Sequence, residues 1–330
     1  MSYDREKVAA VVQPPKGIKL PGFDVVGSRK IFYAISGGLL ALALIVSIVF
    51  GVKIDIKFTG GTIATYSYTG EIDEAEFEKT VEDVTGHDVT VSGSKDLMTG
   101  NNTFTVNFTE AVALDVEEQT AMNDAIDEAF PDNKIETVNV NSVSPTMGTD
   151  FLLKCLVAVS FAAVVMVIYV GLRFRKIGGV KAGVCALLAL FHDLCMVYAT
   201  FVFFRMPLDD NFMSIMLVIL GYSVNDTIVI YDRVRENEAL YRNAKLTPSE
   251  LVNLSINQSL SRCLHTSATT IFSMIVVLAK ALINGVDSIV TFTLPLIIGL
   301  ISGTYSTICI ACPTWVAWLE SGAKKSKKRG

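Results

Sequence analysis

The sequence has few of the residues that form metal sites, disulfides or nucleotide-binding loops. It contains only 3 histidines in 330 residues, and these lie too far apart along the chain to match a metal-ligand motif. Its 6 cysteines all lie in or beside apolar runs, which excludes a disulfide framework within residues 53–148. It has neither a glycine-rich loop with the lysine of a nucleotide site nor an H-E-x-x-H sequence. We therefore expect a protein that is not an enzyme and binds no cofactor.

Long apolar runs are what the sequence has instead. Apolar residues make up 51% of the chain, and six runs are long enough to cross a bilayer as helices. We predict an α-helical membrane protein with six transmembrane helices. The predicted spans are 31–52, 151–172, 180–204, 213–231, 261–283 and 289–319.

The charges divide the chain into an acidic segment and a basic remainder. Residues 53–149 hold 5 Lys/Arg against 19 Asp/Glu, a net charge of −14, whereas the other residues hold 23 against 14, a net of +9. Alternating apolar residues and helical spacing in this acidic segment predict the order β-α-β-β-α-β, that of a ferredoxin-like α+β domain. Such an acidic domain is not expected to bind nucleic acid. The first predicted strand is 54–68, interrupted by Gly60-Gly61. The other predicted strands are 88–92, 103–108 and 135–143, and the predicted helices are 73–85 and 115–130.

Lysine and arginine placement predicts the orientation in the membrane. Basic residues gather in the N-terminal tail, in 173–176, in 233–245 and in the C-terminal tail. Six spans put all four segments on one side, which the positive-inside rule makes the cytoplasm. Both termini are then cytoplasmic and the α+β domain is extracytoplasmic. The predicted division is 1–30 (tail), 31–52 (first span), 53–148 (outer domain), 149–319 (spans two to six) and 320–330 (basic tail).

The fourth span carries polar residues within an apolar run. On a helix, Tyr222, Ser223, Asn225 and Asp226 share an arc of roughly 200° with Thr227, whereas Val224 and Ile228 point the other way. A carboxylate at that depth costs about 2.5–3.5 kcal/mol on insertion scales. Our hypothesis is that Asp226 titrates or pairs with a cation during a working cycle. The alternative is that it only joins two helices by hydrogen bonds.

Three further ionisable residues lie in or at the edge of spans. Asp226 and Arg262 both fall in the inner half of the bilayer, so they can meet if the fourth and fifth helices are neighbours, and the guanidinium would then stabilise the ionised carboxylate. The alternative for Arg262 is a side chain that reaches the membrane interface. His192 and Asp193 form a polar pair in the third span, either as part of an ion relay or as a hydrogen-bonded packing pair.

Several motifs, in matching order, resemble the SecD/SecF family of protein-export membrane subunits, on its SecF side. The resemblance covers most of the chain after residue 20. One departure is Lys57, which stands where the family often has an acidic residue. The motifs are Phe58-Thr59-Gly60-Gly61-Thr62, Val143-Ser144-Pro145, His192-Asp193, Gly221-Tyr222-Ser223-Val224-Asn225-Asp226-Thr227, Arg233-Val234-Arg235-Glu236-Asn237, and Ser259-Leu260-Ser261-Arg262 with Thr266-Ser267-Ala268-Thr269-Thr270.

The resemblance implies an accessory subunit of the Sec translocase in the cytoplasmic membrane of a bacterium. Its partners would be SecD, the SecYEG channel, a preprotein driven by SecA, and the lipid bilayer. The family uses proton flow, or sodium flow in some relatives, and its ion-coupling aspartate and arginine fall on Asp226 and Arg262. The alternative is a small-molecule exporter of the resistance-nodulation-division type, although such chains usually carry two six-span halves. A passive scaffold is a third reading, and it needs no titrating aspartate.

Overall fold

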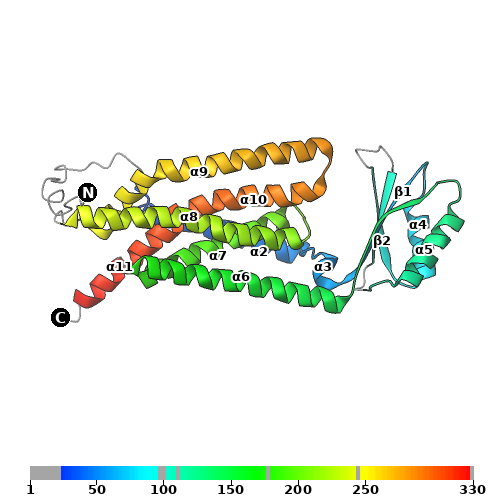
Figure 1. The fold of residues 1–330 in the computed structure, drawn as a ribbon, viewed down its shortest axis with the longest axis horizontal. Helices are drawn as coiled ribbons and strands as arrows, with labels where there is room; N and C mark the ends of the chain where they lie inside the picture. Colours follow the sequence, from blue (N-terminus) through cyan, green and yellow to red (C-terminus); the bar gives the residue numbers. More distant parts are fainter. Residues whose placement is uncertain (1–23, 96–101, 109–111, 176–178, 243–245, 328–330) are drawn as a thin grey trace, which may run out of the picture.

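The molecule is an elongated bundle of helices with a small α+β domain at one end. The computed structural model describes residues 24–95, 102–108, 112–175, 179–242 and 246–327. Figure 1 shows the helices side by side along the long axis and the sheet beyond them. Six helices within these residues are long and apolar enough to cross a membrane, as the apolar runs predict. They are α2 (Arg29–Phe50), α6 (Pro145–Arg173), α7 (Gly179–Phe203), α8 (Asp210–Leu240), α9 (Pro248–Asn284) and a last span built from α10 (Asp287–Ser306), η3 (Thr307–Ala311) and α11 (Cys312–Lys327).

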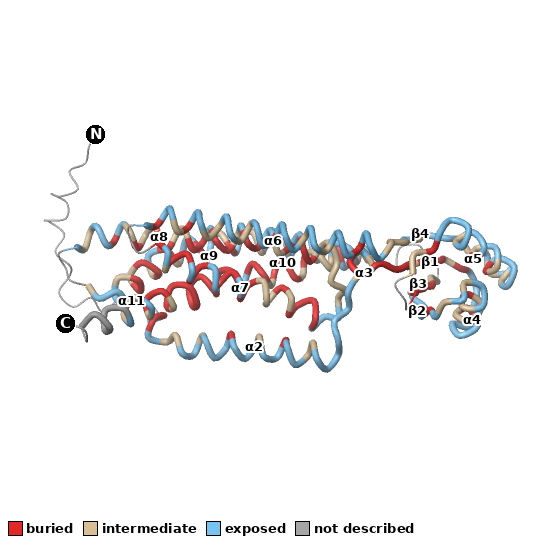
Figure 2. The backbone as a smooth tube through the Cα atoms, turned by 90° about the horizontal axis from the view of Figure 1, so that it is seen from below, coloured by how far each residue is buried: buried red, intermediate tan, exposed pale blue. Residues whose placement is uncertain are grey.

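Three of the spans form the centre of the bundle and three surround it. The most apolar window of α7 is 56% buried, that of α8 is 50% buried and that of the last span 78%. The corresponding windows of α2, α6 and α9 are 11%, 6% and 11% buried. Figure 2 shows the buried backbone concentrated along α7 and α10. The peripheral helices instead present long apolar side chains, which suits contact with lipid.

The last span changes its helical pitch in the middle. Pro295 lies inside α10, but the irregular turn comes later, where residues Thr307–Ala311 form the π-helix η3. Single π-helical turns occur frequently at functional sites. Pro313 is the second residue of α11, which continues directly from η3, so its missing N–H falls within a continuous helical run.

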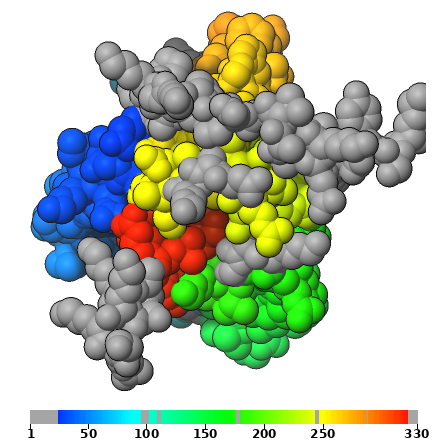
Figure 3. Space-filling model, turned by 90° about the vertical axis from the view of Figure 1, so that its left-hand side faces the viewer, coloured from blue at the N-terminus to red at the C-terminus, as the bar shows by residue number. Residues whose placement is uncertain are grey.

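The start of α2 and the end of α11 lie at the end of the bundle opposite the sheet. Figure 3 looks onto this end and shows the start of α2 beside α11. Arg29 lies 3.7 Å from Glu320 in an ion pair, and the hydroxyls of Tyr33 and Thr314 are 2.8 Å apart. The first and last spans are therefore neighbours.

The α+β domain has the predicted ferredoxin-like topology. Its sheet has the order β2-β3-β1-β4, and every neighbouring pair is antiparallel. Buried aromatic side chains, among them Tyr66, Phe77 and Phe104, hold the sheet against α4 and α5. Asp115 and Glu118 form a capping box at the start of α5. The elements are β1 (Gly61–Tyr68), α4 (Glu74–Thr85), β2 (Val89–Lys95), β3 (Asn102–Phe108), α5 (Val116–Ala129) and β4 (Glu136–Val143).

One predicted strand is partly wrong. Within 54–68, residues Ile56–Thr59 form a short helix, α3, because the Asp55 side chain caps it by accepting the N–H of Lys57. Gly60 then adopts a φ of 81°, and β1 begins only at Gly61. A Cβ on Gly60 would lie 2.4 Å from Cα of Pro145, so this glycine lets α3 pack directly on the start of α6.

Candidate functional site

A cluster of polar side chains lies where the three central spans meet. These side chains come from elements that are otherwise apolar, and all are buried. Buried polar groups need hydrogen-bond partners, so their arrangement is set by the bonds they exchange. The members are His192 and Asp193 from α7, Ser223, Asp226 and Thr227 from α8, Ser267 from α9, and Ser302, Thr304, Ser306 and Thr307 from the last span.

Asp193 accepts the shortest hydrogen bonds to a carboxylate in this cluster. Its carboxylate accepts hydrogen bonds of 2.7 Å from the hydroxyls of Ser223, Ser302 and Ser306. His192 Nδ1 is 3.3 Å from the same carboxylate, and Asp193 has no exposed surface. The structure therefore brings His192, Asp193 and Ser223 together, as the hypothesis of a polar pair in the third span allows.

Asp226 accepts longer hydrogen bonds in the same cluster. Its Oδ2 accepts from the hydroxyl of Thr304 at 3.2 Å and from that of Ser267 at 3.5 Å, and these two hydroxyls are 2.6 Å from each other. The Cys263 thiol is a further hydrogen-bond neighbour. Asp226 is 2% exposed. Bonds of 3.2 and 3.5 Å are at the long end of the hydrogen-bond range, so they stabilise the carboxylate weakly.

The face predicted for the fourth span is only partly correct. Ser223, Asp226 and Thr227 are buried together as expected, but Asn225 is exposed. Val224, predicted to point away from the polar face, is buried because α8 packs against α7, α9 and α10 and so buries a wider arc. Tyr222 is half-buried, and its hydroxyl has no partner among the residues that the structure describes.

The predicted meeting of Asp226 and Arg262 does not occur. Arg262 is exposed, and none of the ion pairs between described residues joins it to Asp226. The neighbouring positions Cys263 and Ser267, one helical turn apart, face Asp226 instead. Because successive helical residues differ by about 100°, Arg262 points to the side of α9 away from the cluster.

The sixth-span hydroxyls were missed by the sequence analysis. Ser302, Thr304, Ser306 and Thr307 donate or accept in the cluster, and the hydroxyls of Thr227 and Thr307 are 3.0 Å apart. The signal was present, because five of the six residues from Ser302 to Thr307 are polar or glycine within an apolar run.

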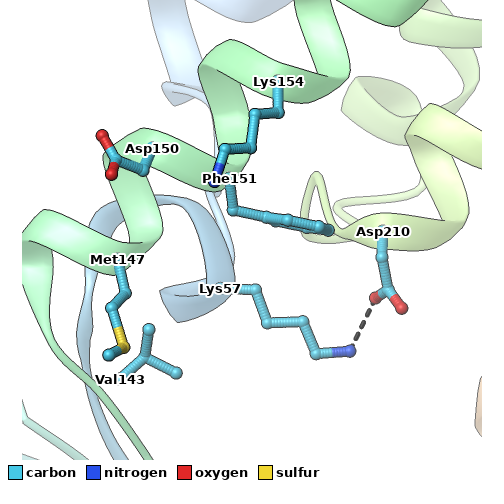
Figure 4. A pocket seen from close by; sticks show the side chains of 7 residues that line it. All are labelled: Lys57, Val143, Met147, Asp150, Phe151, Lys154 and Asp210. Carbon is cyan, nitrogen blue, oxygen red and sulfur yellow. Dashed lines mark hydrogen bonds and ion pairs between the residues drawn. The ribbon is translucent and has the colours of Figure 1, made fainter.

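The end of α8 nearest the sheet contacts α3 and the residues just before it, which lead into the α+β domain. Lys57 Nζ lies 2.6 Å from Asp210, and this hydrogen bond raises the pKa of Lys57 above its ordinary value. Beside it, Leu208 exchanges backbone hydrogen bonds of 3.0 and 2.9 Å with Asp55 and Lys53. Figure 4 shows the pair on the edge of an open pocket of about 490 Å³. Seven residues line that pocket: Lys57, Val143, Met147, Asp150, Phe151, Lys154 and Asp210.

No metal centre of the usual kind is seen in the described part of the chain. No three His, Cys, Asp or Glu side chains there gather closely enough to hold a metal ion. The six cysteines are free thiols.

Comparison with known proteins assigns the family. A family model described as protein export membrane protein SecD/SecF, C-terminal, matches residues 122–321. The chain belongs to the SecD/SecF family. It is a multi-pass membrane protein, and its similar curated relatives are bacterial.

Relatives named SecF match this SecD/SecF chain over nearly its full length. Protein translocase subunit SecF of Anaerolinea thermophila is 32% identical over 93% of this chain and 97% of its own length. The subunit of the same name from Alicyclobacillus acidocaldarius is 31% identical over 93% of this chain and 96% of its own length.

Longer members of the family match over one part only. Protein translocase subunit SecDF of Bacillus subtilis is 30% identical, with 92% of this chain matching 39% of that protein. The crystal structure of SecDF, a translocon-associated membrane protein from Thermus thermophilus, has a TM-score of 0.73 and 28% identity, covering 96% of this chain and 41% of that one. SecDF in its super-membrane-facing form gives a TM-score of 0.61, 26% identity and coverage of 97% and 42%. The chain thus spans about two fifths of these SecDF proteins.

Proposed function

We propose that this chain is a subunit of the bacterial Sec translocase and uses an ion gradient, together with a SecD-type partner, to drive late preprotein export. Its relatives are named SecF or SecDF translocase subunits. The chain aligns with about two fifths of the SecDF structures, which leaves room for a partner carrying the rest. The SecYEG channel and a preprotein driven by SecA complete the proposed assembly. No step in this proposal makes or breaks a covalent bond.

The proposed orientation follows from the positions of the basic segments. Arg173, Arg233 and Arg235 lie at the end of the bundle where α2 begins and α11 ends, whereas the acidic α+β domain lies at the opposite end (Figure 1). Basic residues favour the cytoplasmic side. This supports cytoplasmic termini and an α+β domain on the outer surface, where a preprotein would emerge.

The observation that carries the ion-coupling part of the proposal is the environment of Asp226. This carboxylate is buried in a membrane-spanning bundle, accepts two long hydroxyl bonds, and has no ion-pair partner among the described side chains. A buried carboxylate with so little support changes easily between its charged and neutral forms. Such a change would allow one H⁺ or Na⁺ to be taken up and released in each cycle.

A polar stripe on the outside of α8 and α9 supports a SecD-type partner. Asn225 on α8 and Arg262, His265 and Thr269 on α9 are all exposed within membrane-spanning helices. Polar groups facing hydrocarbon are costly, so such positions usually contact another protein. We place the partner's helices on this stripe. Arg262 would then pair with an acidic group of the partner, or reach Asp226 when α9 rotates.

The structure supplies a route from Asp226 to the α+β domain. Asp226 and Asp210 lie on the same helix, α8, and Asp210 binds Lys57 of α3. Gly60 alone separates α3 from β1. A displacement of α8 on ion binding would therefore act directly on the first strand of the outer domain.

The test is the isosteric replacement Asp226→Asn. Export of a preprotein by the assembled translocase would be measured in membrane vesicles with and without an imposed ion gradient. We expect the variant to insert normally and to lose the stimulation by the gradient, because an amide cannot gain or lose the charge. Asp232→Asn, a half-exposed carboxylate six residues further along the same helix and paired with Arg173, is the matched control and should retain the stimulation.

Undiminished gradient-dependent export by Asp226→Asn would refute the coupling role. Equal losses in Asp226→Asn and Asp232→Asn would refute it as well, because the effect would then belong to any charge removed from α8.

A further inference from the structure

Two charged side chains near the start of α6 have no charged partner among the described residues. Asp150 and Lys154 are exposed, and none of the ion pairs between described side chains includes either of them. Opposite charges four residues apart on a helix commonly pair, yet these two stay apart. Both line the open pocket beside Lys57 and Asp210, which pair with each other. Among its described lining residues, the pocket thus offers one uncompensated cation and one uncompensated anion.

The same face of α6 carries two exposed apolar side chains. Met147 is 71% exposed and Phe151 is 42% exposed. The Phe151 ring stacks on the buried Phe58 of α3, with ring centroids 5.7 Å apart, which holds this apolar wall in place. Residues 147, 150, 151 and 154 recur at the spacing of one helix face, and Figure 4 shows them on the turns of α6 that border the pocket. A ligand in the pocket therefore meets charged and apolar groups together.

The charges along α6 place Lys154 at the edge of the hydrocarbon core. Lys154 lies 19 residues before Arg173, which is about 29 Å of helix at a rise of about 1.5 Å per residue, and residues 155–172 carry no charge. That length is close to the ~30 Å thickness of the hydrocarbon core. Lys154 and Arg173 thus lie at its two boundaries, and Asp150 lies one turn beyond Lys154. The pocket is at the headgroup level of the leaflet nearest the α+β domain.

A phospholipid with a zwitterionic headgroup complements these groups. Its phosphate would accept from Nζ of Lys154, and its ammonium would donate to the carboxylate of Asp150. Its glycerol and upper acyl carbons would cover Met147 and Phe151. The volume of about 490 Å³ is that of an ordinary ligand pocket.

The balance of charge selects the class of lipid. Two lysines and two aspartates line the pocket, so its described side chains carry no net charge, which favours a zwitterion over an anionic lipid. A primary ammonium has N–H groups to donate to Asp150, which the quaternary ammonium of choline lacks. We propose that this pocket is a binding site for a phospholipid of the phosphatidylethanolamine class.

Native mass spectrometry of the purified, delipidated full-length chain in detergent measures this binding. The probes are dioleoyl phosphatidylethanolamine, dioleoyl phosphatidylcholine and dioleoyl phosphatidylglycerol, each titrated alone. We expect phosphatidylethanolamine to bind about fivefold more tightly than either of the others, because it alone fills both charged positions with a hydrogen-bonding group of the right sign.

Single variants test each charged position. Lys154→Met should weaken phosphatidylethanolamine binding about tenfold, and Asp150→Asn should weaken it about fivefold and remove the preference over phosphatidylcholine. Both side chains are exposed, so both variants should fold, and unchanged unfolding midpoints without added lipid check this. Lys280→Met is the matched control: it removes an exposed lysine near the end of α9 that does not line the pocket, and it should leave all three affinities unchanged.

The proposal fails if the wild type binds the three lipids equally. It also fails if Lys280→Met weakens binding as much as Lys154→Met does, because any lysine near the membrane surface would then serve. A preference for phosphatidylethanolamine that survives in Asp150→Asn overturns it too, since the ammonium would then bind elsewhere. These measurements need neither a partner nor an ion gradient, so their outcome is independent of the proposed function.

Discussion

The two buried carboxylates of the bundle differ in how firmly they are held. Asp193 accepts three hydroxyl bonds of 2.7 Å, whereas Asp226 accepts bonds of 3.2 and 3.5 Å. Both are at most 2% exposed, so burial does not distinguish them. Several short hydrogen bonds hold a carboxylate firmly in place, and few long ones hold it less firmly. A charge inside a membrane helix is therefore not by itself a sign of a coupling group.

The difference follows from the position of each residue in the bundle. Asp193 lies between α7, α8 and α10, the most buried helices, where donors approach from several sides. Asp226 receives one of its two hydroxyl bonds from Ser267 of the peripheral α9. We expect the side toward α9 to be the one that changes when a partner or an ion binds.

The largest expected effect is the difference in unfolding free energy between variants at the two aspartates. Asp193→Asn should lower the free energy of unfolding by about 2–4 kcal/mol, because an amide cannot satisfy three hydroxyl donors. Asp226→Asn should change it by less than about 1 kcal/mol. Denaturant or thermal unfolding in detergent measures both. Equal losses of unfolding free energy in the two variants would show that the two carboxylates are held equally firmly.

A smaller effect is expected when a single serine hydroxyl that donates to one of the aspartates is removed. Ser302→Ala removes a 2.7 Å bond to Asp193 and should cost about 1–3 kcal/mol of unfolding free energy. Ser267→Ala removes a 3.5 Å bond to Asp226 together with a 2.6 Å bond to the Thr304 hydroxyl, and should cost about 0.5–1.5 kcal/mol. The two changes delete the same atom from buried serines, so each serves as the control for the other. A greater loss from Ser267→Ala would reverse the comparison.

The smallest effect concerns the ion pair between Lys57 and Asp210 at the end of α8 nearest the sheet. Both side chains are nearly half exposed, so Lys57→Met should cost less than about 1 kcal/mol. Because Asp210 raises the pKa of Lys57 above 10.5, the pair contributes fully below that pH and is lost as pH rises through the higher folded value. Unfolding of the wild type and of Lys57→Met between pH 8 and 11.5 measures this.

Lys154→Met is the control for that change. Lys154 lines the same pocket, and no ion pair to another described residue involves it. Its replacement should leave the pH dependence of the wild type unchanged. If the two lysine variants behave identically, the pair with Asp210 is not what stabilises the junction.

The sequence predicts most of the fold because its patterns are local. Six apolar runs and the β-α-β-β-α-β alternation each depend on residues close together in the chain. The strand predicted for 54–68 is wrong where a cap at Asp55 outweighs the apolar pattern and starts a helix. Propensity cannot show that Gly60 will contact Pro145, which lies far along the chain.

The site is less predictable because it depends on which helices are neighbours and how each is rotated. Asp226 and Asp193 are visible as charges in apolar runs, but the sequence pairs Asp226 with Arg262, and the structure pairs it with Thr304 and Ser267. Turning α9 about its axis by the angle between successive residues, about 100°, decides which of these side chains faces Asp226. Asn225 shares the predicted polar arc with Asp226 but is exposed, since the packing of α8 against three other helices decides which part of that arc is buried.

The close contact between α3 and α6 has a mechanical consequence. The chain enters the small domain at Gly61 and leaves it at Val143, and these two residues are paired across β1 and β4. A Cβ on Gly148 would lie only 2.8 Å from N of Gly60. The segment that leads into the domain and the segment that leaves it are therefore in direct contact. The domain is therefore attached to the bundle at two adjoining points, and we expect it to move with α6 as one body.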